Sequence, residues 1–280
     1  MSGLSDAQRA QYARDGFLAP LPVMPEEEAA ALLARLEAVE REEGGKLSAA
    51  TNQKPYLLFP FLADVVRDAR ILDAVEAVLG ADILCWAGGF FGKEPHDGKR
   101  ITWHQDSTYW GLSAPDICTA WLALTPSTPQ SGCMRVMPGT HGTDQLPHRD
   151  TFAADNLLSR GQEIAVEVDE RAAVDVVLRP GQMSLHHVRL IHGSEPNRAE
   201  HRRIGLAIRY IPTRIFQTAS SDDSASLVRG VDRFGHFAPE PRPLTDRDPA
   251  CVAFHARMLA RTQSILYAGA AQPGRDRAGM

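Results

Sequence analysis

Histidine and aspartate occur together in two H-x-D triplets, a spacing that can bind a metal ion. The triplets are HQD at residues 104–106 and HRD at residues 148–150. Alternate residues of a strand point to the same face, so an H-x-D on or just after a strand aims both side chains into one cavity. The first triplet follows the strand-like run ITW, whereas the second lies in a polar connection after Pro147. We expect metal ligands at the first triplet and a surface turn at the second.

A third ligand is offered by the run QMSLHHVRLIHGSEPN, which covers residues 182–197. Non-haem iron(II) oxygenases bind their metal through two histidines and one carboxylate, which leaves positions open for a co-substrate and O2. His192 ends a strand-like run directly before Gly193, where the mouth of a barrel would place a ligand. His186 and His187 are interpreted as packing residues, although His186 shares strand parity with His192 and could support it.

Two arginines on the run RRIGLAIRY, residues 202–210, bear on the co-substrate. In a strand, Arg203 and Arg209 share one face with small residues, while the other face is apolar. The distal carboxylate of 2-oxoglutarate needs a cationic partner, and the guanidinium group of arginine binds a carboxylate through two parallel hydrogen bonds. The small residues between the arginines leave room for such a ligand. We therefore expect the apolar face to pack on helices.

The surrounding pattern predicts a single domain over residues 1–280. Helices are expected at 5–16, 25–44 and 61–79, which form a helical buttress over residues 1–80. Short β-rich runs separated by Gly, Pro and Asp fill residues 81–212 and indicate a mainly β core, a double-stranded β-helix (jelly-roll, cupin-like) barrel. Residues 213–280 form a variable C-terminal segment, with a polar loop at 218–248 that could act as a lid and a last helix near 249–268.

Composition argues against several classes of function. The formal net charge is −5, and no cluster of Lys and Arg forms the basic stripe of a nucleic-acid-binding protein. No run approaches the roughly 20 apolar residues of a membrane helix, and the N-terminus lacks a secretory pattern. The four cysteines are scattered without a C-x-x-C pair. These features favour a cytoplasmic protein that acts on a small molecule.

Taken in order, the motifs resemble the phytanoyl-CoA dioxygenase family of 2-oxoglutarate oxygenases. The resemblance runs from the opening helix to about residue 212, and Arg203 stands eleven residues after His192, as the family's 2-oxoglutarate arginine does. The motifs are DGF at 15–17, WHQD at 103–106, AWLAL at 120–124, SGCMRVMPGTH at 131–141 and PGQMSLHHVRLIHGSEPN at 180–197.

This resemblance implies Fe(II), 2-oxoglutarate and O2 as cofactor and co-substrates. It makes His104, Asp106 and His192 the iron ligands. It also implies that the co-substrate is bound by four residues, which are Arg203, Ser194, Trp121 and, on a loose alignment, Lys54. Halogenases of the family carry Gly or Ala in place of the carboxylate ligand. The presence of Asp106 therefore favours hydroxylation of a C–H bond, with release of succinate and CO2.

Several outcomes stay open at this level. The same site could perform a desaturation, a ring closure or an epimerisation. Two rivals of another class are a non-catalytic barrel that binds metal or 2-oxoglutarate and a zinc hydrolase, but neither explains an arginine at this spacing as well. The substrate and the oligomeric state are not readable. Candidate substrate contacts are Tyr109, Trp110, Arg209 and Arg229, of which the arginines would suit an anionic substrate.

Overall fold

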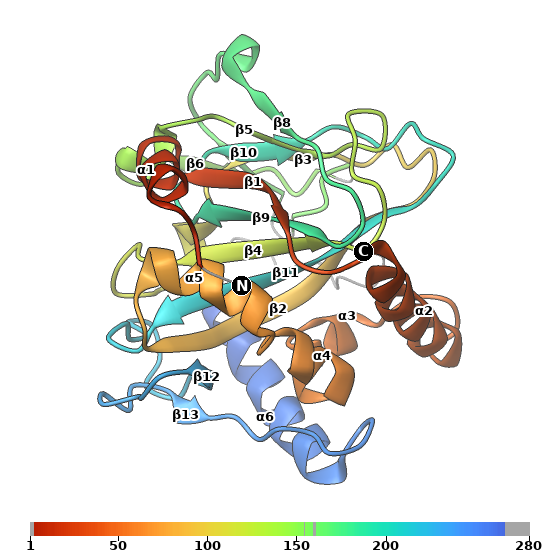
Figure 1. Cartoon of the computed structure of the whole chain (residues 1–280), viewed down its shortest axis with the longest axis vertical. Coiled ribbons are helices and arrows are strands. Elements are labelled where there is room, and N and C mark those ends of the chain that lie inside the picture. Colours follow the sequence, from red (N-terminus) through yellow and green to blue (C-terminus); the bar gives the residue numbers. More distant parts are fainter. Residues whose placement is uncertain (1–2, 154, 159–160, 267–280) are drawn as a thin grey trace.

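Two largely antiparallel β-sheets form the centre of the molecule (Figure 1). The structure, a computed structural model, describes residues 3–153, 155–158 and 161–266. Within that part, the major sheet contains, in spatial order, β1 (Phe17–Pro22), β9 (Gln182–His187), β4 (Cys118–Ala123), β11 (Arg203–Pro212), β2 (Ile83–Lys93), β12 (Ser224–Arg229) and β13 (Ala238–Pro239). The minor sheet contains β3 (Ile101–His104), β10 (His192–Ser194), β5 (Met134–Val136) and β8 (Val174–Val176). The short strands β6 (His148–Asp150) and β7 (Gln162–Ile164) form a separate pair. This is the expected mainly β, jelly-roll architecture.

Strand β11 lies at the middle of the major sheet and shows why the sheet has two different faces. It pairs antiparallel with β4 on one side and with β2 on the other. Its alternate residues Ile204, Leu206 and Ile208 enter the main hydrophobic core, as the strand parity predicts. The opposite face carries Arg203, Ala207 and Arg209 into a cavity between the two sheets.

Helices cover the outer face of the major sheet (Figure 1). The helices are α1 (Asp6–Asp15), α2 (Glu26–Glu42), α3 (Ala49–Asn52), α4 (Pro60–Val65), α5 (Ala69–Leu79) and α6 (Pro249–Leu266). The single helix expected over 61–79 is thus divided into α4 and α5. Asp68 starts a new helix by accepting a hydrogen bond from the backbone N–H of Arg70, and the hydroxyl of Tyr210 donates to the carbonyl of Val66 at 3.0 Å. A buried partner on the sheet therefore stabilises the break.

The first 80 residues are not purely helical, which corrects the expectation of a helical buttress. Helix α1 begins at a capping box formed by Ser5 and Gln8 and ends at Gly16, whose φ of 77° is left-handed. The chain then turns into β1, whose Phe17 pairs with His186 at the edge of the major sheet. The run FLAPLP does not by itself predict a strand, because its two prolines lower strand propensity.

The C-terminal segment is more ordered than expected. Strands β12 and β13 occupy part of the predicted loop at 218–248, and β12 pairs with β2 at the edge of the sheet. The last helix begins at Pro249 as predicted, and its described part ends at Leu266. In the described ranges, no helix is long and apolar enough to cross a membrane.

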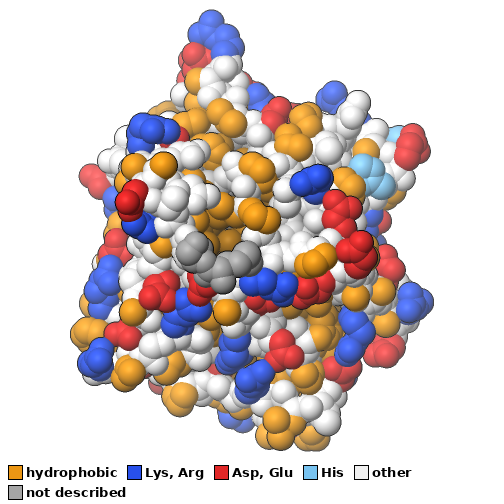
Figure 2. Space-filling view, viewed as in Figure 1, with side chains coloured by type: hydrophobic (Ala, Val, Ile, Leu, Met, Phe, Trp, Pro, Cys, Tyr) orange, Lys and Arg blue, Asp and Glu red, His pale blue; other side chains and the backbone are white. Residues whose placement is uncertain are grey.

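Basic and acidic side chains are interspersed on the face shown in Figure 2. Ion pairs at the surface of the molecule include Arg70 with Glu28 and Arg242 with Asp64. On this face no broad area of one charge gathers, which agrees with the absence of a basic stripe in the sequence.

Candidate active site

The cavity between the two sheets has about 540 Å³ of space, part of it open to solvent. The minor sheet contributes residues from β3, β10 and β5, and the major sheet contributes residues from β2, β4, β9 and β11. The lining residues are Phe91, Ile101, His104, Asp106, Thr119, Trp121, Met134, Leu158, His186, His192, Gly193, Ser194, Arg203, Ala207 and Arg209. A concave site that combines apolar side chains with a few polar groups is typical of small-molecule binding.

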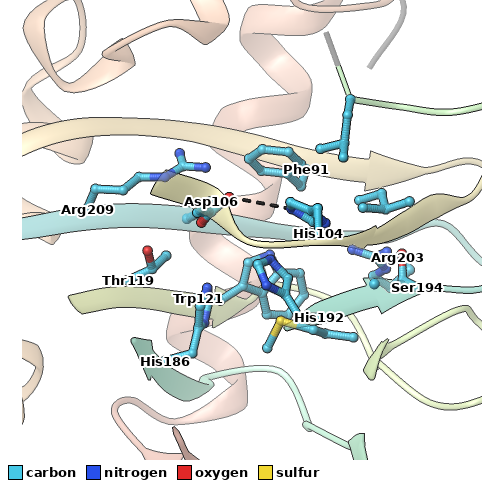
Figure 3. Close-up of a pocket in the computed structure, with 15 residues that line it drawn as sticks. Phe91, His104, Asp106, Thr119, Trp121, His186, His192, Ser194, Arg203 and Arg209 are labelled. Carbon is cyan, nitrogen blue, oxygen red and sulfur yellow. Dashed lines mark ion pairs between the residues drawn. The ribbon is translucent and has the colours of Figure 1, made fainter. Parts of the chain in front are cut away.

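His104, Asp106 and His192 meet on one wall of this cavity (Figure 3). His104 ends β3 and His192 begins β10, and the two residues are direct partners in the pairing of these strands. Asp106 follows at the start of a short 3₁₀ turn, where its backbone N–H donates to the carbonyl of Val188 at 3.0 Å. One possible ligand atom from each residue lies within 4.8 Å of the others, which is close enough for one ion to contact all three.

The hydrogen bonds of both histidines fix which ring nitrogen faces the site. Nδ1 of His104 lies 2.9 Å from the carbonyl oxygen of Thr102, and Nδ1 of His192 lies 2.9 Å from that of Leu190. A carbonyl can only accept, so Nδ1 carries the proton in each ring and Nε2 keeps its lone pair. This tautomer is the one that a histidine ligand needs. The donor set therefore fits a divalent metal.

Burial and charge act on the ionisable groups of this wall in opposite directions. Burial raises the pKa of Asp106, but its interactions with His104 and His192 outweigh burial and hold that pKa far below its usual range. Burial also lowers the pKa of His192 to about 3, with the neighbouring His104 adding to the effect. An ionised carboxylate beside neutral imidazoles is the protonation state in which these groups bind a metal.

Arg203 lies at one end of the cavity and is 4% exposed. Its guanidinium donates to the carbonyl of Gly132 at 2.9 Å and lies 5.5 Å from the ring of Trp121. Its Nε has no partner, and among the described side chains no carboxylate lies within 4.0 Å of it. Burial lowers the pKa of Arg203 to about 10. A buried cation without a counter-charge is suited to an anionic ligand.

Gly205 is needed beside this arginine. A Cβ at this position would clash with the ring of Trp121 and lie 2.7 Å from the carbonyl oxygen of Leu122. The small residue therefore lets the Trp121 ring pack against β11, where the ring lies 5.5 Å from the Arg203 guanidinium.

Lys93 is a second buried basic residue at the same end, and the sequence analysis missed it. It is the direct pairing partner of Arg203 across β2 and β11, and its Nζ donates to the hydroxyl oxygen of Ser194 at 2.7 Å. Burial and the charge of Arg203 lower the pKa of Lys93 to about 6. Ser194 lines the cavity as predicted, with Lys93 behind it.

Two predicted site residues do not reach the cavity. The ammonium group of Lys54 forms an ion pair with Glu240 at 2.7 Å, and both side chains are buried. Arg229 pairs with Asp73 and Glu76 on α5. Both long side chains instead form ion pairs with carboxylates that lie outside the cavity. The structure thus corrects both placements.

The remaining substrate candidates are divided. Arg209 lines the cavity, and its guanidinium lies 5.2 Å from the ring of Phe91. Trp110 is not a lining residue, but its ring lies 5.7 Å from the Arg209 guanidinium and 5.2 Å from the ring of Trp86. The side chain of Tyr109 lies outside the described residues.

The second H-x-D triplet is not a surface turn. His148 is half-buried on β6, and its Nε2 accepts a hydrogen bond of 3.0 Å from the backbone N–H of Gln105, the residue between two candidate ligands. Its Nδ1 lies 2.8 Å from the carbonyl oxygen of Leu146, so this ring is also held in one tautomer. The side chain of Gln105 in turn accepts from the backbone N–H of Leu146. Only the tertiary fold brings the two triplets together.

The phytanoyl-CoA dioxygenase (PhyH) family model matches residues 12–205. The chain belongs to this family. The matched range contains the three candidate metal ligands, Arg203 and Ser194. It ends before β12, β13 and α6, so the C-terminal segment lies outside it.

Solved structures and curated relatives agree with this membership. The structure described as "non-heme monooxygenase; ThoJ apo" is 36% identical with a TM-score of 0.83, and the match covers 92% of this chain and 97% of that one. CytC3, described with Fe(II) and alpha-ketoglutarate, is 24% identical with a TM-score of 0.66 over 88% and 97% of the chains, and it supports the fold alone. A "probable alpha-ketoglutarate-dependent hypophosphite dioxygenase" of Stutzerimonas stutzeri is 28% identical over 56% of this chain and 55% of its own length. The chain therefore spans about half of that curated relative.

Proposed function

We propose that this protein is an Fe(II)- and 2-oxoglutarate-dependent dioxygenase that hydroxylates a C–H bond of a small molecule. The proposal rests on one observation, which is that a metal-binding cluster and an anion-binding residue line the same cavity. A two-histidine, one-carboxylate cluster lies beside a buried arginine with no carboxylate partner among the described residues. Iron alone would not need the arginine, and a simple anion-binding site would not need the cluster.

In this proposal, His104, Asp106 and His192 hold the iron and leave its remaining positions to the co-substrates. When bound, Fe(II) with 2-oxoglutarate and O2 supplies an oxidant able to remove hydrogen from a C–H bond, with succinate and CO2 as co-products. Arg203 binds the distal carboxylate of 2-oxoglutarate, and the Ser194 hydroxyl is a second donor. The two sheets exclude bulk water from the reacting atoms and hold the substrate near the metal.

Hydroxylation is the proposed outcome because Asp106 completes the ligand set. Its carboxylate lies 3.5 Å from Nε2 of His104 and so takes the place that a halide would need. The relative described as a non-haem monooxygenase is consistent with insertion of oxygen.

The test is release of CO2 from carboxyl-labelled 2-oxoglutarate, with and without added Fe(II). We expect iron-dependent turnover in the wild type and its loss in His104→Ala and His192→Ala, while melting temperatures stay close to that of the wild type. His201→Ala is the matched control, because His201 is exposed and lies outside the cavity. Equal turnover in the ligand variants and the control would refute the proposal. With a substrate in hand, incorporation of one oxygen atom from labelled O2 would establish hydroxylation, and its absence would refute that outcome.

A further inference from the structure

Three polar residues form a row across the major sheet, at the end of the cavity opposite Arg203. Arg209 on β11 is the direct partner of Thr119 on β4, and Thr119 is the direct partner of His186 on β9. All three side chains line the cavity. Direct partners on one face of a sheet have Cβ atoms about 5 Å apart, so the three side chains are neighbours.

Two members of this row hold buried polar atoms that have no hydrogen-bond partner among the described residues. The hydroxyl oxygen of Thr119 and Nδ1 of His186 are both unpaired, although these residues are only 1% and 3% exposed. Leaving a buried polar group unpaired destabilises the folded state, so most such groups in native proteins have a partner. Their place on the cavity wall indicates that a ligand supplies the missing partner.

The metal-binding side chains lie between this row and the Arg203 end of the cavity (Figure 3). Arg203 and Arg209 are six residues apart on one strand, which separates their Cα atoms by about 20 Å. The five-carbon chain of 2-oxoglutarate, with bonds of about 1.5 Å, spans only about 6 Å. A co-substrate bound to Arg203 and the metal therefore does not fill the row.

We infer that Arg209, Thr119 and His186 form the subsite that anchors the substrate, and that they do so through a carboxylate group of the substrate. This inference rests on the proposed function and adds the substrate class to it. Arg209 supplies a positive charge for such a group, and the hydroxyl of Thr119 offers a donor. The imidazole of His186 can donate to the same carboxylate or contact a polar atom beside it.

The aromatic neighbours of Arg209 favour a planar anion. Its guanidinium lies 5.2 Å from the Phe91 ring and 5.7 Å from the Trp110 ring, which hold the fork in place. A guanidinium held in place matches the two oxygens of a carboxylate. The arginine side chain then loses less rotamer freedom when the ligand binds. A substrate bound in this way would present a carbon close to its acid group to the metal.

The experiment uses anaerobic protein loaded with Fe(II) and 2-oxoglutarate. Acetate, butanoate, benzoate and the common amino acids are titrated in, each beside its primary amide, and binding is followed by saturation-transfer NMR. We expect binding to be confined to acids, with each matched amide about a hundredfold weaker. The amide keeps the size of the acid but loses the charge that the Arg209 guanidinium binds.

Variants then assign the binding to the row. Thr119→Val removes one donor without changing the side chain's shape and should weaken the best acid about tenfold, and Arg209→Gln should weaken it about a hundredfold. Ser184→Ala is the matched control. Its hydroxyl is equally buried and unpaired on the same strand as His186, but Ser184 does not line the cavity. Affinity for the acid in this control should stay within about twofold of the wild type.

The results separate the two levels of the argument. Failure of the protein to load Fe(II) and 2-oxoglutarate would refute the proposed function before any acid is added. Normal loading with no acid bound, or amides bound as tightly as acids, would overturn the inference and leave the proposed function standing. Equal effects of Thr119→Val and Ser184→Ala would overturn it as well.

Discussion

Arg203 and its neighbour Arg202 provide a sharp test, because adjacent residues of one strand are expected to serve different purposes. Arg203 points into the cavity with its charge buried and no carboxylate partner among the described residues. Arg202 points to the other face, where it pairs with Glu40 at 2.7 Å and with Glu94 at 3.0 Å. Replacing each with methionine removes the charge and keeps most of the volume.

The expected magnitudes follow from what each guanidinium contacts. Loss of a charge-assisted pair with the co-substrate costs about 3 kcal/mol, which corresponds to on the order of a hundredfold in the dissociation constant of 2-oxoglutarate. Without co-substrate, Arg203→Met should be as stable as the wild type or more stable, because it removes a buried charge that has no counter-charge. Arg202→Met should do the reverse. It should keep co-substrate affinity but lose about 1–3 kcal/mol of stability, since the Glu40 side chain stays buried without its partner.

The assay is calorimetric titration of 2-oxoglutarate into anaerobic Fe(II)-loaded protein, together with melting curves of the protein alone. For a chain of this size, 1 kcal/mol corresponds to about 2–4 °C. Arg203→Lys should recover only part of the affinity, because an ammonium group cannot reproduce the guanidinium fork. Unchanged 2-oxoglutarate affinity in Arg203→Met, or its loss in Arg202→Met, would show that the reasoning from strand parity is wrong.

Three further predictions concern Asp106, His148 and Lys93. Asp106→Gly should abolish CO2 release from labelled 2-oxoglutarate, and full activity would mean that another carboxylate binds the metal. His148→Ala should weaken Fe(II) binding about tenfold in equilibrium competition. His148→Gln should restore the affinity, because its amide oxygen can accept the hydrogen bond from the Gln105 N–H. Equal Fe(II) affinities in the wild type and both variants would show that His148 does not have this role. Because the pKa of Lys93 is lowered to about 6, a bound carboxylate should raise it and take up a proton near neutral pH, so 2-oxoglutarate affinity should fall as pH rises from 6.5 to 8. Calorimetry in two buffers measures that uptake, and Lys93→Met should lose it.

The same pKa shift has a defined sign for stability. Unfolded lysine titrates near 10.4, so between about pH 6 and pH 10 the unfolded chain binds more protons at Lys93 than the folded chain. The contribution of this residue to stability therefore rises with pH across that range, and it is least favourable below pH 6. Denaturation curves of the wild type and Lys93→Met at pH 6 and pH 9 would measure it. A difference between the two proteins that stays constant with pH would contradict the assignment.

Local periodicity predicted the parts of the site that one strand carries. The alternation on β11 gave the inward Arg203 and Arg209 and the outward apolar residues, because successive side chains of a strand point to opposite faces. The same reasoning placed His104 and Asp106 together. Where the side chain's destination depends on its own strand, sequence pattern was sufficient.

Partners from distant strands could not be predicted in the same way. Lys93 meets Arg203 through the register of β2 against β11, and no local signal encodes that register. Thr119 lies in a run whose pattern predicts only core packing. Its place in the cavity depends on the pairing of β4 with β11 and β9. Long charged side chains were the least predictable, because Arg229 can reach several carboxylates and packing decides which one it meets.

The buried pair of Lys54 and Glu240 affects how much of the chain is needed for folding. Lys54 lies within the range that the family model matches, whereas Glu240 lies beyond its end. The Glu240 carboxylate also accepts hydrogen bonds from the hydroxyls of Ser224 and Ser226, so it joins β12 to the loop before α4. A chain truncated after residue 212 would remove Glu240 and Ser224, so Lys54 would lose its counter-charge and the hydrogen bonds that its ammonium group donates. We propose that residues 213–248 are a required part of a single cooperative unit rather than a detachable lid, and that the family-matched range would not fold to a stable protein when expressed alone.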